Sequence, residues 1–96
     1  MNDDLLSCLD RIDALTEQIT QATAKNEAHA VEQLVIEQCQ QVRSLESYSR
    51  EELPQERIRH IHQAIERQQA VIEQALDVTN HFLKKINELR PFSRMG

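Results

Sequence analysis

Residues 58–89 read IRHIHQAIERQQAVIEQALDVTNHFLKKINEL, and one set of mostly apolar side chains recurs there at alternating steps of three and four. We call this set the seam, and it consists of Ile58, Ile61, Ile65, Gln68, Ile72, Ala75, Thr79, Phe82, Ile86 and Leu89. The spacing is typical of the buried face of an α-helix. Pro54 suits the first turn of a helix, and Pro91 should end it because the residue before a proline avoids helical geometry. The stretch therefore predicts a helix over residues 54–89.

Two shorter helices are expected upstream. The first, over residues 3–24, has its seam at Leu5, Cys8, Ile12, Leu15, Ile19 and Ala22. The apolar positions then change phase, to Ala28, Val31, Leu34, Val35, Cys39, Val42 and Leu45. Because a straight helix cannot change phase and keep one buried face, we expect a hairpin turn at 25–27, where Asn26 tolerates the left-handed conformation, and a second helix over 28–47. A continuous helix with a shifted phase is the alternative.

A polar stretch, residues 47–54, separates the second helix from the third. Ser49 and Glu52 have the spacing of a capping box, which favours a loose turn over residues 49–53. At about 1.5 Å per residue, the first two helices reach roughly 30–33 Å, whereas the third reaches about 54 Å. We therefore expect the third helix to project beyond the hairpin or to pair with another chain.

The composition favours a single all-α domain over residues 1–96. The chain has one glycine, which cannot supply the turns of a sandwich, a barrel or a doubly wound sheet. Together with the seams, this predicts an antiparallel three-helix bundle of helical hairpins with a long C-terminal helix and a short tail over 90–96. Residues 1–48 carry 9 acidic and 3 basic side chains, and residues 49–96 carry 7 and 8. We expect the two halves to complement each other electrostatically.

The sequence contains no residue pattern typical of a catalytic centre. A carboxylate-bridged metal bundle needs a glutamate three residues before a histidine, and no histidine of this chain has one. The histidines are His29, His60, His62 and His81. His62 is instead expected to form a solvated pair with Glu66, and no serine lies in a glycine elbow. We predict no enzyme activity, no metal and no cofactor.

Charge and hydropathy also narrow the class of partner. A net charge of −5 disfavours nucleic acid, and no fully apolar run exceeds three residues, far below the ~20 of a membrane span. We expect neither nucleic acid nor a membrane as partner. The acidic N-terminus lacks a secretory signal, and Cys8 and Cys39 fit buried free thiols, which favours a cytoplasmic location. The locally basic residues 84–94 either complement a helix dipole or bind an anionic partner.

Polar residues interrupt the seams at three positions. Gln68 and Thr79 lie in the seam of the third helix, and Gln38 interrupts that of the second. Such residues either set register and partner choice or face solvent where the third helix overhangs. The sequence leaves both interpretations open.

Three features of the chain combine into a recognisable arrangement: a first amphipathic helix ending in a polar turn at 24–27, a second helix over 31–45 with closely spaced apolar and charged residues, and a long third helix over 58–86. Over roughly residues 5–89 this arrangement resembles the FliT-type flagellar export chaperones, a family of small helical bacterial proteins. The first turn departs from the family, because members often carry Gly and Trp where residues 26–28 read NEA.

The resemblance implies a cytoplasmic, non-enzymatic binding protein of the flagellar type III secretion pathway. Such chaperones hold a late flagellar substrate, typically the filament cap protein, keep it soluble, and deliver it to export-apparatus components. Some also bind the flagellar master transcriptional regulator. An exposed apolar stripe on the third helix is the kind of surface that binds an amphipathic partner helix. The candidate partner-binding residues are Ile72, Leu76, Thr79, Phe82, Leu83 and Ile86.

The same stripe permits two other functions. A structural coiled-coil protein would use it to self-associate as a homodimer, with Gln68 and Thr79 setting the oligomeric state. A regulatory antagonist of a transcription factor would use the same surface as a chaperone, so the sequence does not separate these two.

Overall fold

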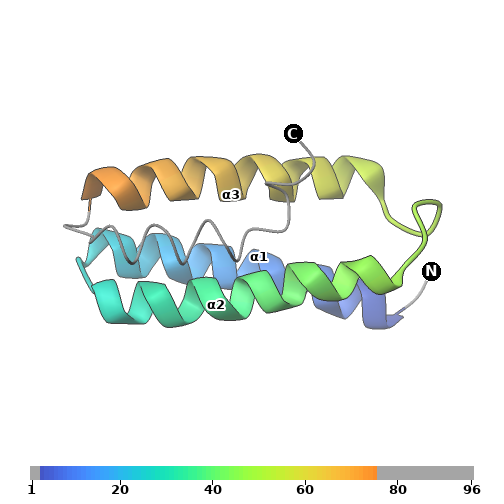
Figure 1. The fold of residues 1–96 in the computed structure, drawn as a ribbon, viewed down its shortest axis with the longest axis horizontal. Helices are drawn as coiled ribbons and strands as arrows, with labels where there is room; N and C mark the ends of the chain where they lie inside the picture. The colour runs from blue at the N-terminus through green and yellow to red at the C-terminus, as the bar shows by residue number, and fades with distance from the viewer. Residues whose placement is uncertain (1–2, 76–96) are drawn as a thin grey trace.

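The computed structural model describes residues 3–75, and within this range the chain forms three α-helices and no strand (Figure 1). α1 (Asp3–Ala24) and α2 (Ala28–Ser44) form an antiparallel hairpin. A 3-10 turn, η1 (Leu45–Ser47), extends α2, and α3 (Gln55–Ala75) runs back along the hairpin. The expected all-α antiparallel bundle is therefore confirmed.

The turn between α1 and α2 is built around Asn26. Among the described residues, Asn26 is the one non-glycine residue with a positive φ, at 60°. The backbone N–H of Glu27 donates to the carbonyl of Ala22 at 3.0 Å, and that of Asn26 donates to the carbonyl of Thr23 at 3.0 Å. These two bonds satisfy carbonyls that a helix end otherwise leaves unpaired. The chain therefore reverses here, and the alternative of a continuous helix is wrong.

The connection between α2 and α3 is a turn, and α3 begins at Gln55, one residue after the predicted start. The backbone N–H of Glu52 donates to the carbonyl of Ser49, and the Ser49 hydroxyl donates to the Glu52 carboxylate at 3.1 Å. The two residues thus close a turn and do not cap α3. The N–H of Ile58 donates to the carbonyl of Pro54 at 3.0 Å, so that Pro54 precedes the first helical residue, Gln55.

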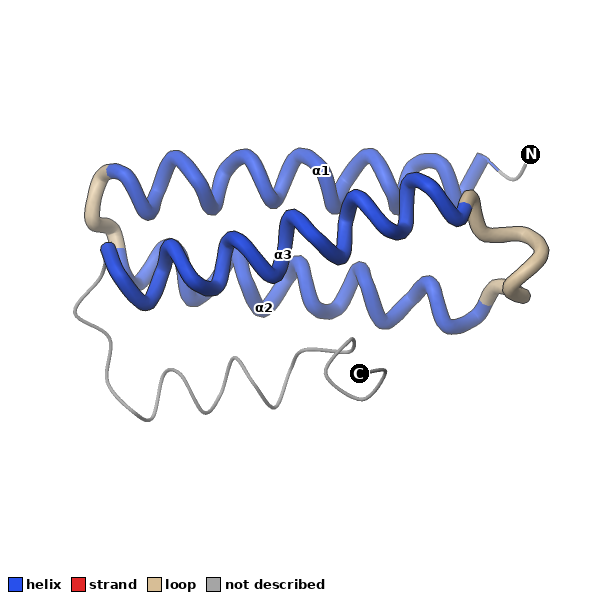
Figure 2. Tube along the Cα trace, turned by 90° about the horizontal axis from the view of Figure 1, so that it is seen from above, coloured by secondary structure: helices blue, strands red, loops and turns tan. Residues whose placement is uncertain are grey.

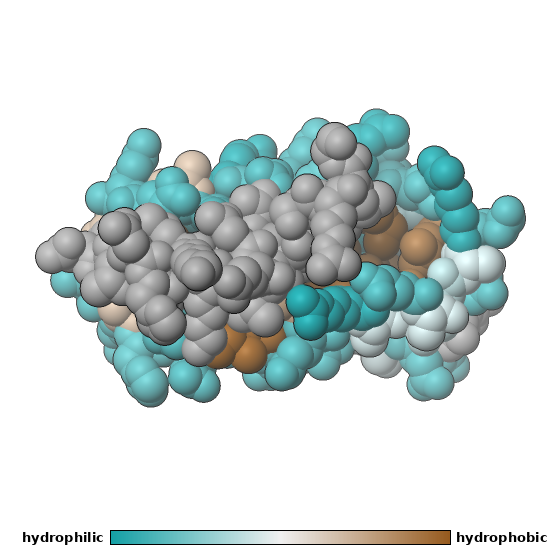
Figure 3. All heavy atoms as spheres, in the orientation of Figure 1, coloured by the Kyte–Doolittle hydropathy of each residue, from teal (hydrophilic) through white to brown (hydrophobic). Residues whose placement is uncertain are grey.

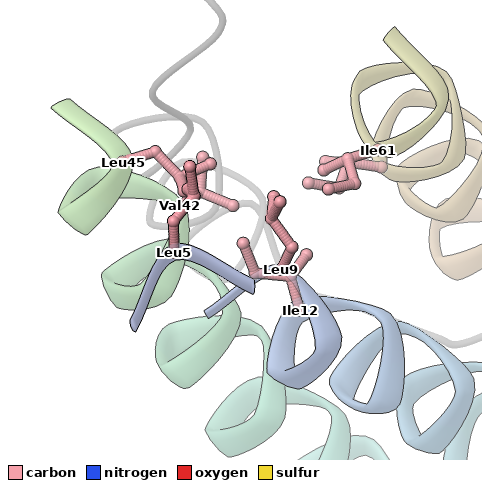
Figure 4. Close-up of a cluster of buried hydrophobic side chains, with 7 residues drawn as sticks. Leu5, Leu9, Ile12, Val42, Leu45 and Ile61 are labelled. Atoms are coloured by element: carbon pink, nitrogen blue, oxygen red, sulfur yellow. The ribbon is translucent and has the colours of Figure 1, made fainter. Parts of the chain in front are cut away.

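The bundle core consists of two apolar clusters, one near each end. The loop-end cluster, near the connection from α2 to α3, contains Leu5, Leu9, Ile12, Val42, Leu45, Ile61 and Ile65. Figure 4 shows side chains of this cluster arriving from all three helices, with Ile61 pointing toward Leu9. The turn-end cluster contains Ile19, Ala22, Val31, Val35, Cys39 and Ile72. Full burial of one Leu or Ile contributes roughly 1.5–3 kcal/mol, so these clusters supply most of the attraction between the helices.

Ion pairs join α1 to both other helices on the outside of the bundle. One amino group of the Arg57 guanidinium on α3 lies 2.6 Å from a carboxylate oxygen of Asp10 and 2.9 Å from one of Asp13. Arg11 on α1 pairs with Glu37 on α2. The expected charge complementarity therefore occurs between the acidic face of α1 and a basic residue of the second half.

The described part of α3 is as long as the hairpin on which it packs. It has 21 residues against 22 in α1, and the two lie alongside each other in both views (Figures 1 and 2). The expected continuation of the third helix to residue 89, and the tail over 90–96, lie outside the described residues.

Candidate partner-binding surface

Of the six candidate partner-binding residues, the structure describes Ile72. Its side chain is 1% exposed and belongs to the turn-end cluster, where it packs with residues of α1 and α2. Ile72 therefore contributes to the core of its own chain. The other five candidates, Leu76, Thr79, Phe82, Leu83 and Ile86, lie outside the described residues.

The position of Ile72 shows how far α3 reaches along the hairpin. Its cluster includes Ala22 and Val31, which flank the turn at 25–27. α3 therefore arrives at the closed end of the hairpin within one turn of Ala75.

A layer of polar side chains lies between the two apolar clusters. We call it the polar layer, and it consists of Thr16 from α1, Gln38 from α2 and Gln68 from α3. The amide nitrogen of Gln38 donates to the amide oxygen of Gln68 at 3.1 Å, and the amide nitrogen of Gln68 donates back to the oxygen of Gln38 at 3.0 Å. The nitrogen of Gln38 also donates to the Thr16 hydroxyl at 2.9 Å.

All hydrogen-bonding groups of the Gln38 amide, the most buried side chain of the polar layer, have partners. Gln38 is 1% exposed, and both hydrogens of its amide group and its carbonyl oxygen have partners within the layer. The hydroxyl of Thr16 in turn donates to the carbonyl of Ile12 at 2.8 Å. Because a buried amide without partners is costly, these bonds specify which side chains must face each other.

The polar layer decides between the two interpretations of the seam glutamines. Gln38 is buried and Gln68 is half-buried, and the two pair with each other across the bundle and do not extend into solvent at an overhang. Thr16 was not singled out from the sequence, because it lies one position after the seam residue Leu15 and bonds back along its own helix. Thr79, the third polar seam position, lies outside the described residues.

An open groove of about 240 Å³ runs between α1 and α3 beside the polar layer. The residues that line it are Thr16, Ile19, Thr20, Thr23, Ala64, Arg67, Gln68 and Val71. Small side chains dominate the lining, and Val71 is 52% exposed. Among the described residues that line the groove, Arg67 is the one charged side chain.

α2 and α3 pack against each other less closely than either of them packs against α1. α1 packs along both α2 and α3, whereas α2 and α3 approach each other at few points. Among the described residues visible in Figure 3, most are hydrophilic, and hydrophobic atoms are seen between α2 and α3 near the connection that joins them. α1 is therefore the central element of the described fold.

The two thiols differ in their surroundings. Cys39 is buried in the turn-end cluster, as expected. Cys8 is half-buried, which corrects the expectation of burial: its sulfur lies 3.1 Å from the Ser44 hydroxyl and 3.3 Å from the carbonyl of Gln41. The reason is that Cys8 lies at the edge of the α1 seam, facing the polar side of α2.

Arg57 and His62 are two charged or titratable groups at the surface of α3 that interact with carboxylates. The hydrogen bonds that Arg57 donates to Asp10 and, second in effect, to Asp13 raise the pKa of Arg57 above its ordinary value. His62 lies 3.5 Å from Glu66 on α3, with both side chains half-exposed, which confirms the expected solvated pair. Within residues 3–75, no group of three or more potential ligands is placed to hold a metal ion.

Comparisons with known proteins add no relative. The sequence matches no protein-family model, no curated protein and no solved structure. Among the helices of residues 3–75, none combines the length and the hydropathy needed to cross a membrane.

Proposed function

We propose that this chain is a non-enzymatic chaperone or adaptor that binds an amphipathic helix of a protein partner along the stripe that continues the seam of α3. The observation that carries the proposal is the position of Ile72. This residue already packs against Ala22 and Val31 at the closed end of the hairpin. The seam nevertheless continues in the sequence with Phe82, Ile86 and Leu89, and apolar Leu76 and Leu83 lie beside it. We infer that a straight α3 could not bury all of these residues on its own hairpin.

The partner class follows from the chemistry of this stripe. Apolar residues at helical spacing bind an amphipathic helix by burying its apolar face. The resemblance to the FliT-type chaperones supports a flagellar export substrate as that partner, with the filament cap protein as the first choice. In this proposal the chain acts in the cytoplasm, keeps the substrate soluble and passes it to the export apparatus.

The experiment is size exclusion with light scattering on the protein alone and on its mixture with the purified filament cap protein of the same genome. The proposal expects a stable complex that keeps the cap protein in solution. Leu76→Asp and Leu83→Asp should each abolish the complex, because a charge in the stripe cannot be buried without a partner. Gln74→Asp is the matched control, since Gln74 is an exposed residue of α3.

The alternative function is that of a structural protein that self-associates as a homodimer. A second copy of the chain would bury the apolar stripe as well as a partner helix would. The homodimer would appear as twice the monomer mass in the absence of the cap protein. If Leu76→Asp and Leu83→Asp dissociate that dimer and the cap protein never binds, the chaperone proposal is wrong and the stripe is an oligomer interface.

A further inference from the structure

The seam of α3 repeats so regularly that most of it fits the hairpin in more than one alignment. Ile58, Ile65 and Ile72 follow one another at intervals of seven residues. Sliding α3 by seven residues, about 10.5 Å, returns the seam to the same face and puts one isoleucine in the place of the next. Apolar packing by itself therefore discriminates poorly between alignments related by one heptad.

The polar layer removes this ambiguity. In each helix its member lies between two core residues: Thr16 between Ile12 and Ile19, Gln38 between Val35 and Val42, and Gln68 between Ile65 and Ile72. The reciprocal amide pair forms in one alignment only. After a slide of seven residues, Gln38 would face Ile61 or Ala75, and its buried amide would lose the partner that Gln68 provides.

We propose that the polar layer fixes the alignment of α3 on the α1–α2 hairpin and thereby determines which part of the apolar stripe the hairpin covers. In the observed alignment the closed end of the hairpin lies beside Ile72, and the stripe from Leu76 onward, which the proposed function gives to a partner, lies outside the described residues. The pair of Arg57 with Asp10 and Asp13 favours the same alignment near the other end of α3. The last step, access of the partner, rests on the proposed function, whereas the alignment itself does not.

The first test replaces the two glutamines of the polar layer by apolar side chains of similar volume. Gln and Met side chains have similar shape, so the double variant Gln38→Met with Gln68→Met keeps the core filled. We expect it to fold with unchanged helix content but to show two or more sets of backbone amide signals for α3 in NMR spectra, where the wild type shows one. The matched control, Gln40→Met with Gln63→Met, alters two exposed glutamines of the same helices and should show one set.

The second test moves the layer and does not depend on the first variant folding. Gln68→Ile, Ala75→Gln and Thr79→Ile together carry the polar position one heptad along α3 and leave the neighbouring seam positions apolar. In the wild type, Ile61 points toward Leu9 (Figure 4). In the triple variant, we expect methyl contacts of Leu9 with position 68 in place of Ile61, which corresponds to a slide of about 10.5 Å.

The outcomes separate the alignment from the function. One set of signals in the double Met variant, or unchanged Leu9–Ile61 contacts in the triple variant, would overturn the proposal. If α3 slides, the triple variant draws part of the stripe onto the hairpin, and its affinity for the purified cap protein should fall at least tenfold. A slide with unchanged cap binding supports the role of the polar layer in alignment and shows that the proposed partner surface is wrong.

Discussion

Gln38 and Gln68 exchange two amide hydrogen bonds, of 3.1 and 3.0 Å, across the bundle and 30 residues apart in the sequence. Gln38 makes a third bond, to Thr16, so that one buried side chain joins all three helices. The apolar clusters on either side attract the helices without specifying their alignment. A pair of amides that satisfy each other adds this specificity at little net cost in stability.

The amide pair predicts strong coupling between two mutations. Gln68→Met alone should lower the free energy of unfolding by about 1–3 kcal/mol, because it leaves part of the buried Gln38 amide without a partner. Adding Gln38→Met should recover most of that loss. Urea unfolding of the wild type, both single variants and the double variant measures the coupling. Equal and additive losses would show that the two amides do not depend on each other.

Because Ile72 is buried, truncating it should lower the stability of the protein strongly, whereas truncating its exposed neighbour Val71 should lower it very little. Ile72→Ala should destabilise the protein by about 2–5 kcal/mol, because it leaves a cavity among the residues beside the turn. Val71→Ala is the matched control, since Val71 is 52% exposed, and it should change stability by less than about 0.5 kcal/mol. Thermal or urea unfolding distinguishes the two. Similar effects at positions 71 and 72 would contradict the packing of α3 described above.

The positive φ of Asn26 predicts opposite effects for two small residues. Asn26→Gly should be neutral or stabilise by up to about 1 kcal/mol, because glycine adopts this conformation without strain. Asn26→Ala should destabilise by about 1 kcal/mol, because its Cβ clashes in the left-handed region. Lys25→Ala, at the exposed neighbouring residue, serves as the control in the same unfolding experiment. A loss with glycine as large as with alanine would contradict the turn geometry.

The ion pairs of Arg57 should contribute to the free energy of unfolding by an amount that depends on salt, and the titration of Arg57 should not change it near neutral pH. Its pairs with Asp10 and Asp13 are partly exposed, so Arg57→Gln should cost about 0.2–1 kcal/mol in dilute buffer and less in about 1 M salt, where screening acts within roughly 3 Å. Because the pKa of Arg57 is raised in the folded protein, its own titration removes stability only in strongly alkaline solution. Unfolding curves at two salt concentrations provide the test. A difference that does not shrink with salt would show that Arg57 acts through packing.

Local signals in the sequence were sufficient for the limits of α1 and α2, for the start of α3 and for the first turn. The predicted limits of the first helix, 3–24, match α1, and the predicted range 28–47 matches α2 together with η1. The phase change after Ala22 located the turn because a helix can bury one face only. The start of α3 was predicted one residue early, since a proline is equally acceptable just before a helix and in its first turn.

Other features depend on which residues meet across the bundle. The sequence marked Gln38 and Gln68 as polar seam positions, but both interpretations were open until the helices were placed side by side. Thr16 carried no signal, because its role arises from its neighbours on α2 and not from its own helix. The partial exposure of Cys8 likewise depends on where α2 lies relative to the edge of α1.

The sequence by itself determined the helical class, the limits of α1 and α2 and the turn at Asn26, because periodicity, capping and backbone preference act over a few neighbouring residues. Only the tertiary structure decided that Gln38 faces Gln68, that Ile72 is core, and that Ile72 brings α3 level with the closed end of the hairpin. The physical reason is that the seams repeat every seven residues. A repeating pattern states which face of a helix is buried, whereas the position of one helix along another is set by the few side chains that break the repeat.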